Sequence, residues 1–309
     1  MRSVVFAYHD MGLAGLGALE RAGIEIAAVF THEDDPQEKC WFGSVKDWAI
    51  RNGIPVHCPE EVNSPDWVGR IAALRPEALF SFYYRRMLKE GILALPSGGA
   101  YNLHGSLLPA YRGRCPVNWV LVQGEARTGV TLHHMVARAD AGDIVGQRAV
   151  PIERTDTAVL LYRKLCAAGG ELLDGLLPRI MTGTAPRIPQ DIAQGSYFGG
   201  RRPEDGRIDW HWPAERIYNL IRAVTDPYPG AFCHLPDGTK LTIWWAVPEE
   251  TAGFDPASGP GKIEVEEGRV LVRSGQGRVL LTDAETGDGR MTGDRLRRYF
   301  NERKGQVVL

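Results

Sequence analysis

Hydrophobic residues in the first half of the chain form short continuous runs, separated by longer stretches with apolar residues at helical spacing. The runs predict buried strands, and the longer stretches predict amphipathic helices. Buried strands that alternate with helices of about ten residues are typical of an α/β fold with a doubly wound, mostly parallel sheet. The expected strands cover residues 3–8, 25–30, 78–82, 100–103, 131–136 and 143–150, and the expected helices 13–22, 44–52, 65–73 and 157–180.

The pattern changes in the second half of the chain. Residues 182–206 are rich in glycine, proline and polar residues and show little periodicity, which is typical of a linker. A helix is expected near residues 213–224, and the short apolar runs that follow are separated by turn signals, which predicts a small antiparallel β unit of barrel type. We therefore expect an N-terminal α/β domain at 1–185, a linker at 186–206 and a C-terminal β-barrel domain at 207–309.

Composition and charge exclude several classes of protein. Hydrophobic residues make up 44% of the chain and charged residues 24%, which argues against disordered and fibrous proteins. Lysine and arginine (36) nearly balance aspartate and glutamate (38), with 20 against 21 in residues 1–200, so a nucleic-acid partner is disfavoured. No apolar run approaches the ~18 residues of a membrane span, so no membrane partner is expected. Five scattered cysteines without a C-x-x-C pair predict a reducing, cytoplasmic setting.

Two features that are typical of ligand sites have simpler interpretations. Gly12, Gly15 and Gly17 have the spacing GxxGxG, which is not the GxGxxG fingerprint of dinucleotide-binding proteins. We interpret them as small residues that allow a helix to pack closely on the sheet. His133 and His134 are adjacent in a predicted strand, so their side chains should point to opposite faces and cannot hold one metal ion together. Structural roles are expected for both.

Asn102 and His104 form a stronger candidate site. They lie two residues apart at the end of a predicted strand, so both side chains should share one face, with Leu103 on the other. Ligands bind at the carboxyl ends of strands in open α/β sheets, and an amide beside an imidazole can stabilise a negative oxygen or move a proton. Asp140, in a tight loop, is the expected partner that favours the charged form of His104. Spacing alone leaves a catalytic and a structural arrangement equally open.

Residues 102–113 read Asn-Leu-His-Gly-Ser-Leu-Leu-Pro-Ala-Tyr-Arg-Gly. This segment resembles the signature of the formyltransferases that use 10-formyltetrahydrofolate. Shorter motifs at 9–12, 80–85, 116–122 and 128–133 resemble more narrowly the formyltransferase domain of the bifunctional polymyxin-resistance enzyme. That domain formylates UDP-4-amino-4-deoxy-L-arabinose in lipid A (lipopolysaccharide) modification. The resemblance extends from residue 1 to about 231. It implies a Rossmann-like catalytic domain followed by a small OB-like barrel.

The resemblance also implies roles for individual residues. His104 corresponds to the family's catalytic acid and base, Asn102 to the residue that stabilises the transition state, and Asp140 to the carboxylate that tunes the histidine. Formyl transfer to an amine requires no metal, and no metal-ligand spacing is visible in the sequence. The segments that correspond to the folate contacts are Arg86, Met87, Leu88, Arg114, Val136, Ala137, Arg138, Ala139 and Asp140.

The expected partners are therefore 10-formyltetrahydrofolate and a UDP-linked amino sugar. A homo-oligomer is also compatible with the sequence. The alternatives are a methionyl-tRNA formyltransferase, a formyltransferase for another nucleotide-linked amino sugar, and a binding module with a degenerate site. The loop at 31–44 argues against a tRNA acceptor because it is acidic, whereas the corresponding loop of the tRNA enzymes is long and basic. It holds Lys39 against Glu33, Asp34, Asp35 and Glu38. The bifunctional relative continues into an NAD-dependent decarboxylating domain. We expect no such activity from a sequence that ends at Leu309.

Overall fold

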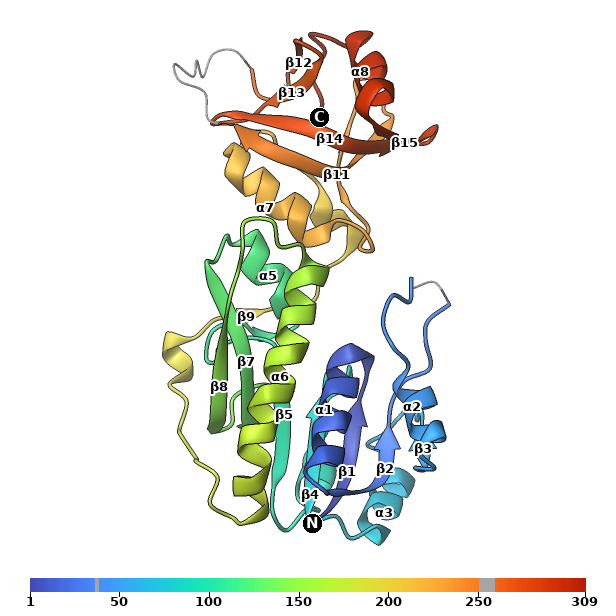
Figure 1. The fold of residues 1–309 in the computed structure, drawn as a ribbon, viewed down its shortest axis with the longest axis vertical. Coiled ribbons are helices and arrows are strands. Elements are labelled where there is room, and N and C mark those ends of the chain that lie inside the picture. The colour runs from blue at the N-terminus through green and yellow to red at the C-terminus, as the bar shows by residue number, and fades with distance from the viewer. Residues whose placement is uncertain (37–38, 250–258) are drawn as a thin grey trace. The chain divides into compact units, whose positions relative to one another are not determined.

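The computed structural model describes residues 1–36, 39–249 and 259–309 of the chain, which form two compact units (Figure 1). Unit 1 consists of Met1–Pro116, Ala126–Ile152 and Leu161–Gly199, and unit 2 of Val117–Glu125, Glu153–Leu160 and Gly200–Leu309. Among the described helices, none combines the length and the apolar character needed to cross a bilayer.

A seven-stranded sheet forms the centre of unit 1, with the strand order β3-β2-β1-β4-β5-β7-β8. The strands from β3 to β5 run parallel, whereas β7 is antiparallel to β5 and β8 is antiparallel to β7. The predicted α/β fold with a mostly parallel sheet is confirmed. The strands are β1 (Arg2–Ala7), β2 (Glu25–Phe30), β3 (Val56–His57), β4 (Ala78–Phe82), β5 (Ala100–His104), β7 (Arg127–His134) and β8 (Ile144–Pro151).

Aromatic and aliphatic side chains from the central strands form the core of unit 1. Phe6 and Phe30 stack with ring centroids 5.1 Å apart, and both are fully buried together with Leu79. Burying one such side chain contributes about 1.5–3 kcal/mol to folding. All residues of β4 are buried, so both faces of this central strand are covered.

The helix α1 (His9–Arg21) packs closely on the sheet through its glycines. A Cβ atom on Gly15 would lie 2.2 Å from the Phe82 ring of β4. One on Gly12 would lie 3.2 Å from the Ala7 Cβ atom of β1 and 2.9 Å from a methyl group of Val45, which follows in the next helix. The predicted packing role of these two glycines is confirmed. The same prediction for Gly17 is wrong, because a Cβ atom there would meet only the end of the Arg21 side chain of the same helix. The remaining helices of unit 1 are α2 (Val45–Arg51), α3 (Pro65–Ala73), α4 (Glu90–Leu93) and, from Leu161 onward, α6 (Ala158–Met181). The helix α5 (Pro116–Val122) belongs to unit 2 from Val117 onward.

Unit 2 contains an antiparallel sheet with the order β10-β11-β14-β13-β12, and β15 pairs with β14. The turn before β11 has Gly238 at φ +85° and a hydrogen bond from the Leu235 N–H to the Thr239 carbonyl, as the sequence Pro236-Asp237-Gly238 predicts. The strands are β10 (Ala231–His234), β11 (Lys240–Glu249), β12 (Ile263–Glu266), β13 (Arg269–Arg273), β14 (Arg278–Thr286) and β15 (Gly289–Thr292), and the helices are α7 (Ala214–Val224) and α8 (Gly293–Asn301).

The segment predicted as a linker contains only short elements. Two 3-10 turns cover Ile192–Gln194 and Pro203–Gly206. The strand β9 (Tyr197–Phe198) pairs with β6 (Arg112–Gly113), the next strand along the chain after β5. The ring of Phe198 stacks on Tyr111 with centroids 4.9 Å apart. The segment therefore supports the loop that leaves β5.

Candidate active site

The end of β5 brings together the three side chains singled out from the sequence. Asn102 and His104 share one face of the strand, and Leu103 is buried on the other. The Asp140 Oδ1 atom lies 3.5 Å from Nδ2 of Asn102 and 3.6 Å from Nδ1 of His104. The side chain of Asp140 is only 13% exposed. One carboxylate oxygen therefore faces both the amide and the imidazole.

Asp140 is held in place by the backbone and by hydrogen bonds from two other segments. It lies in the loop between β7 and β8 with φ +51°, a left-handed conformation that aspartate tolerates better than most residues. The Gly113 N–H donates to its Oδ2 atom at 2.9 Å, and Nε2 of Gln190 donates to its carbonyl oxygen at 3.2 Å. These contacts turn the carboxylate toward β5.

The surroundings of Asp140 keep its side chain ionised. Burial by itself raises the pKa of a carboxyl group. The charge of His104, the contact with His133 and the Gly113 N–H together outweigh burial, so the pKa of Asp140 lies well below its usual 3.8. Asp140 is therefore a fixed negative charge next to His104.

Both ring nitrogens of His104 have acceptors. A carbonyl oxygen can only accept, so the 2.8 Å contact between Nε2 and the Tyr111 carbonyl requires a proton on Nε2. Nδ1 faces the Asp140 carboxylate. An imidazolium would satisfy both contacts, with Nε2–H donating to Tyr111 and Nδ1–H directed at Asp140. The geometry thus supports a charged, proton-donating form of His104.

His133 is a fourth member of this cluster that the sequence analysis missed. Its ring is 2% exposed, and its Nε2 atom lies 3.1 Å from Nδ2 of Asn102 and 3.5 Å from Oδ1 of Asp140. His133 reaches this cluster because β5 and β7 pair in antiparallel fashion, with Asn102 directly opposite His133. That register cannot be read from either segment alone. The prediction that His133 and His134 face opposite ways is confirmed, because the His134 ring packs on Tyr101 instead.

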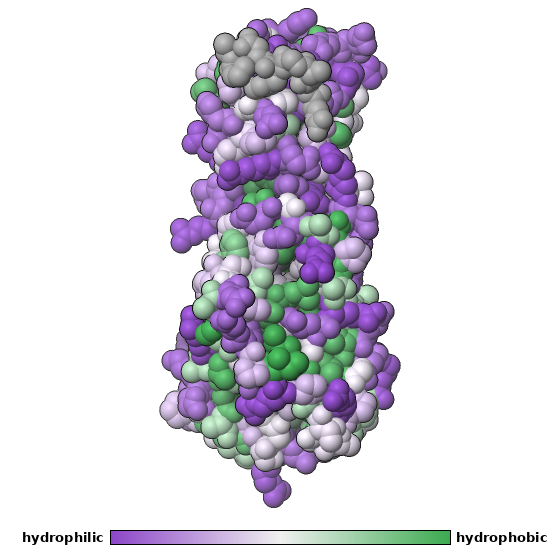
Figure 2. Space-filling view, turned by 90° about the vertical axis from the view of Figure 1, so that its left-hand side faces the viewer, coloured by the Kyte–Doolittle hydropathy of each residue, from purple (hydrophilic) through white to green (hydrophobic). Residues whose placement is uncertain are grey.

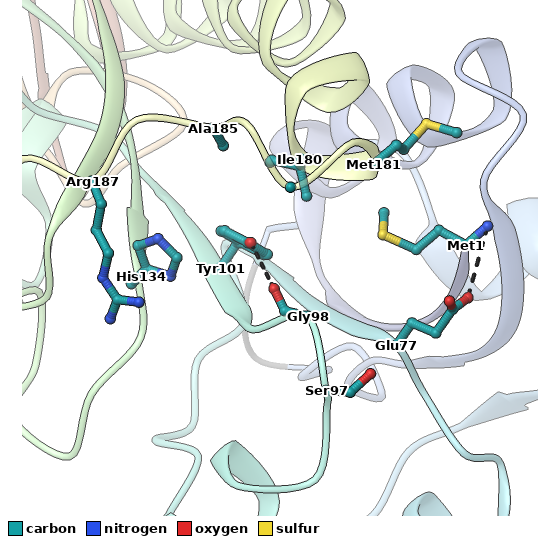
Figure 3. A pocket seen from close by; sticks show the side chains of 11 residues that line it. Met1, Glu77, Ser97, Gly98, Tyr101, His134, Ile180, Met181, Ala185 and Arg187 are labelled. Atoms are coloured by element: carbon teal, nitrogen blue, oxygen red, sulfur yellow. Dashed lines mark hydrogen bonds and ion pairs between the residues drawn. The ribbon is translucent and has the colours of Figure 1, made fainter.

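A cavity of about 490 Å³ lies at the opposite end of β5 (Figure 3). It is lined by residues at or next to the amino ends of β1, β4 and β5, such as Tyr101, and by His134 at the carboxyl end of the antiparallel β7. The end of α6 and the segment after it, including Arg187, complete the lining. The Tyr101 hydroxyl donates to the Gly98 carbonyl at this wall. Asn102, His104 and Asp140 do not line this cavity. It is therefore separate from the candidate site.

Comparison with known protein families agrees with this geometry. Residues 1–176 match the formyl transferase family, and residues 201–299 match the C-terminal domain of formyl transferases. The chain belongs to the formyl transferase family. It is an enzyme that transfers formyl groups, as the resemblance of residues 102–113 implies.

Three solved structures share the fold of this formyltransferase. An N-formyltransferase from Helicobacter canadensis, in complex with folinic acid and dTDP-3-aminofucose, has a TM-score of 0.66 and 22% identity over 91% of this chain and 98% of its own. The sugar 3-N-formyltransferase WlaRD has a TM-score of 0.68 and 19% identity over 93% and 98%. HypX from Aquifex aeolicus has a TM-score of 0.63 and 18% identity over 98% of this chain but 48% of its own. At these identities the likeness establishes the fold.

The segments expected to contact folate in this formyltransferase lie beyond the ends of β4 and β7. Leu88 is buried in an apolar cluster on which Met135, the residue before segment 136–140, also packs. The side chains of Met87 and Val136 are 53% and 42% exposed. Apolar side chains are likewise exposed among polar ones on the face drawn in Figure 2, where they are green.

The two arginines expected to contact folate also have neighbours in the protein. The guanidinium group of Arg86 donates to the Pro59 carbonyl, and the Arg114 backbone N–H donates to the Phe198 carbonyl at 2.9 Å. Because the second contact is made by the backbone, it does not involve the Arg114 guanidinium group.

His9 is a buried, neutral residue near the same end of the sheet. Its ring is 5% exposed and stacks on Phe42, with Trp41 and Tyr162 at its edges. Burial, helped by the charge of Arg85, lowers the pKa of His9 to about 3. Its Nδ1 atom has no hydrogen-bond partner among the described residues. The motif at 9–12 thus contributes an uncharged aromatic cluster next to the strand ends.

Proposed function

We propose that this formyltransferase transfers the formyl group of 10-formyltetrahydrofolate to the 4-amino group of UDP-4-amino-4-deoxy-L-arabinose. The observation that carries the proposal is the meeting of Asn102, His104 and Asp140 at the end of β5. The neutral amine attacks the formyl carbon, and the formyl oxygen becomes negative. The carbon–N10 bond then breaks, N10 gains a proton and the former amine loses one.

His104 has the properties that this proton movement requires. During the reaction its Nε2–H leaves the Tyr111 carbonyl and donates to the reacting groups instead. Asp140 stabilises the proton on Nδ1. A donor aimed at the developing negative oxygen is worth roughly 3–4 kcal/mol of transition-state stabilisation. Because the Asp140 charge is fixed, the pair can release a proton to N10 and recover one from the amine.

The donor site is assigned to the segments 86–88, 114 and 136–140. The exposed apolar side chains of Met87 and Val136 suit the flat rings of a folate, which carry little charge. The guanidinium groups of Arg86 and Arg114 suit its carboxylates. Two of the similar structures were solved with folinic acid or 5-formyltetrahydrofolate, which supports this assignment.

An amino sugar bound to a nucleotide is the acceptor that the observations favour. The Helicobacter canadensis enzyme is complexed with dTDP-3-aminofucose, and WlaRD is a sugar formyltransferase. The loop after β2 argues against RNA, because its acidic residues Glu33, Asp34 and Asp35 disfavour a phosphate backbone. Of these, Asp34 accepts a hydrogen bond from the Tyr8 hydroxyl, and Glu33 pairs with Lys46. Glu38, the fourth acidic residue counted in the sequence of this loop, lies outside the described residues. The UDP-arabinose identity rests on the motifs at 9–12, 80–85, 116–122 and 128–133.

The dTDP-3-aminofucose bound to the Helicobacter canadensis enzyme and the dTDP present with WlaRD give weight to one alternative, which is formylation of a different nucleotide-linked amino sugar. The domain boundaries 1–185, 186–206 and 207–309, the cytoplasmic setting and a homo-oligomer remain predictions from the sequence.

The proposal is tested by incubating the protein with 10-formyltetrahydrofolate and either UDP-4-amino-4-deoxy-L-arabinose or dTDP-3-aminofucose. Mass spectrometry of the product should show the mass of one formyl group added to the UDP sugar. Formylation of the dTDP sugar alone would refute the named acceptor and keep the reaction. No formylation of any amine would refute the proposal.

A further inference from the structure

The segment 187–198 lies between the parts of the chain that match the two formyl transferase domains, and it touches both loops that supply hydrogen-bond acceptors to His104. The segment is anchored at the first residue of β8. Ile188 and Ile144 exchange two backbone hydrogen bonds, of 2.7 and 2.9 Å. These bonds hold the segment beside the loop between β7 and β8.

Gln190 ties down the loop that carries Asp140. Its Nε2 atom donates to the carbonyl oxygen of Asp140 at 3.2 Å and also to that of Gly142. A primary amide has two N–H donors, so both are used in this loop. The Oε1 atom of Gln190 has no hydrogen-bond partner among the described residues, so the two carbonyl groups set the direction of the amide. Asp140 is thereby held with its carboxylate facing Nδ1 of His104.

Ser196 holds the other acceptor of His104. Its Oγ atom accepts a hydrogen bond from the Tyr111 N–H at 2.8 Å, and its carbonyl oxygen accepts one from the Arg112 N–H at 3.0 Å. The Arg112 N–H and the Tyr111 carbonyl belong to one trans peptide group, in which they point in opposite directions. The contact with Ser196 therefore aims the Tyr111 carbonyl at Nε2 of His104, 2.8 Å away.

We propose that Gln190 and Ser196 are positioning residues that hold the two acceptors of the charged form of His104, one at each ring nitrogen. A protonated imidazole carries an N–H at each nitrogen, and hydrogen bonds to the charged form favour that form. The inference rests on the proposed function, because it takes His104 as the acid and base of formyl transfer. It gives the segment predicted as a linker a direct part in building the active site.

The Gly113 amide reports the position of Asp140 without any substrate. The Gly113 N–H donates to Oδ2 of Asp140 at 2.9 Å, whereas the next amide, that of Arg114, donates to the Phe198 carbonyl. In Gln190→Leu, which lacks the two donors, we expect the Gly113 amide to exchange with deuterium about 10-fold or more faster by NMR, and the Arg114 amide to keep its wild-type rate. Unchanged exchange of Gly113, or equal acceleration of both amides, would overturn the inference.

Turnover of Gln190 variants tests the consequence for the reaction. Gln190→Leu should lower kcat about 10-fold or more, because a small displacement of a catalytic group is costly. Gln190→Glu should lower it at least as much, since carboxylate oxygens would face two carbonyl oxygens. Gln194→Leu is the matched control in the same segment, because Gln194 donates to the Asp191 carboxylate instead, and it should leave kcat unchanged. Nearly wild-type kcat in Gln190→Leu would contradict the inference.

A double variant separates positioning from a general loss of structure. Asp140→Asn removes the charge through which Gln190 acts, so adding Gln190→Leu to it should lower kcat little further. If the two losses multiply, Gln190 does not act through Asp140 and its assigned role is wrong.

Ser196→Ala tests the second contact. It should speed deuterium exchange of the Tyr111 amide, leave that of Gly113 unchanged and lower kcat several-fold, since the backbone bond from Arg112 remains. Wild-type kcat in Ser196→Ala would contradict the role of Ser196. Because the exchange readouts need no substrate, a wild-type enzyme that formylates no amine would refute the proposed function separately.

Discussion

His104 Nδ1 lies 3.6 Å from Asp140 Oδ1, at the point where β5 ends. This relationship predicts that alanine at His104 or at Asn102 abolishes most of the activity without unfolding the protein. Turnover should fall by about 100-fold or more in each variant, because each loses a contact made in the transition state. Circular dichroism and thermal unfolding should match the wild type. A well-folded His104→Ala protein with nearly wild-type turnover would refute the role of this residue.

Asp140→Asn should change the pH dependence of both rate and stability. Without the negative charge, the charged form of His104 loses its partner, so the pH–rate profile should move toward acid. The pKa of Asp140 in the folded protein lies below its usual 3.8. Its stabilisation is therefore complete above pH 3.8 and is lost as the pH falls through the folded value.

Urea unfolding of wild type and Asp140→Asn, measured from pH 7 to pH 3, checks the stability part. The gap between the two free energies of unfolding should be constant above about pH 3.8 and should narrow as the pH falls from 3.8 to 3. A constant gap, together with an unchanged pH–rate profile, would contradict the pairing of Asp140 with His104.

His9 should make the protein less stable in mild acid. Its pKa is lowered from 6.5 to about 3 by burial and by Arg85, so the unfolded chain takes up a proton that the folded protein excludes. The free energy of unfolding should fall by roughly 1.4 kcal/mol for each pH unit between 6.5 and 3 from this residue alone.

His9→Asn should remove that contribution, and asparagine tolerates the φ of +66° at this position. The exposed His211→Asn is the control and should retain the wild-type slope. The account of His9 fails if the slope of stability against pH in His9→Asn equals that of the wild type.

Gly15→Ala should destabilise unit 1. The new Cβ atom would lie 2.2 Å from the Phe82 ring, which is buried and cannot move aside, so we expect a cost of about 1–3 kcal/mol. Gly17→Ala is a matched control in the same helix, because its Cβ would meet only the end of the Arg21 side chain at 3.3 Å. It should be neutral or stabilising, since alanine favours helix by about 1 kcal/mol. Equal effects of the two substitutions in chemical denaturation would contradict the packing role of Gly15.

Local patterns predicted much of the fold. The helix α3 and the strand β4 have the expected bounds, and Asn102 and His104 share a face because alternation along a strand requires it. The helix α1 begins four residues earlier than predicted, at His9, because the polar pair His9-Asp10 gives no helical signal. The helix α8 was not predicted, since it buries only Leu296 and Phe300 and most of its other residues are charged.

The candidate site was only partly visible in the sequence. Asp140 was expected to reach His104 from a tight loop, and it does. The position of His133 depends on which residue of β7 pairs with Asn102, a long-range register that neither segment encodes by itself. Likewise, the contact of the His104 Nε2–H with the Tyr111 carbonyl depends on how the chain folds back after β5. Local pattern therefore gives the residue types, and the sheet register gives their partners.

The choice of acceptor is the most direct test of the account. The value of kcat/KM should be measured with 10-formyltetrahydrofolate and either UDP-4-amino-4-deoxy-L-arabinose or charged initiator tRNA, at low and at moderate salt. The account predicts efficient formylation of the sugar nucleotide with a shallow salt dependence, since a diphosphate makes few ionic contacts. It also predicts no turnover of the tRNA. Formylation of the tRNA that falls steeply with salt, with none of the sugar nucleotide, would contradict it.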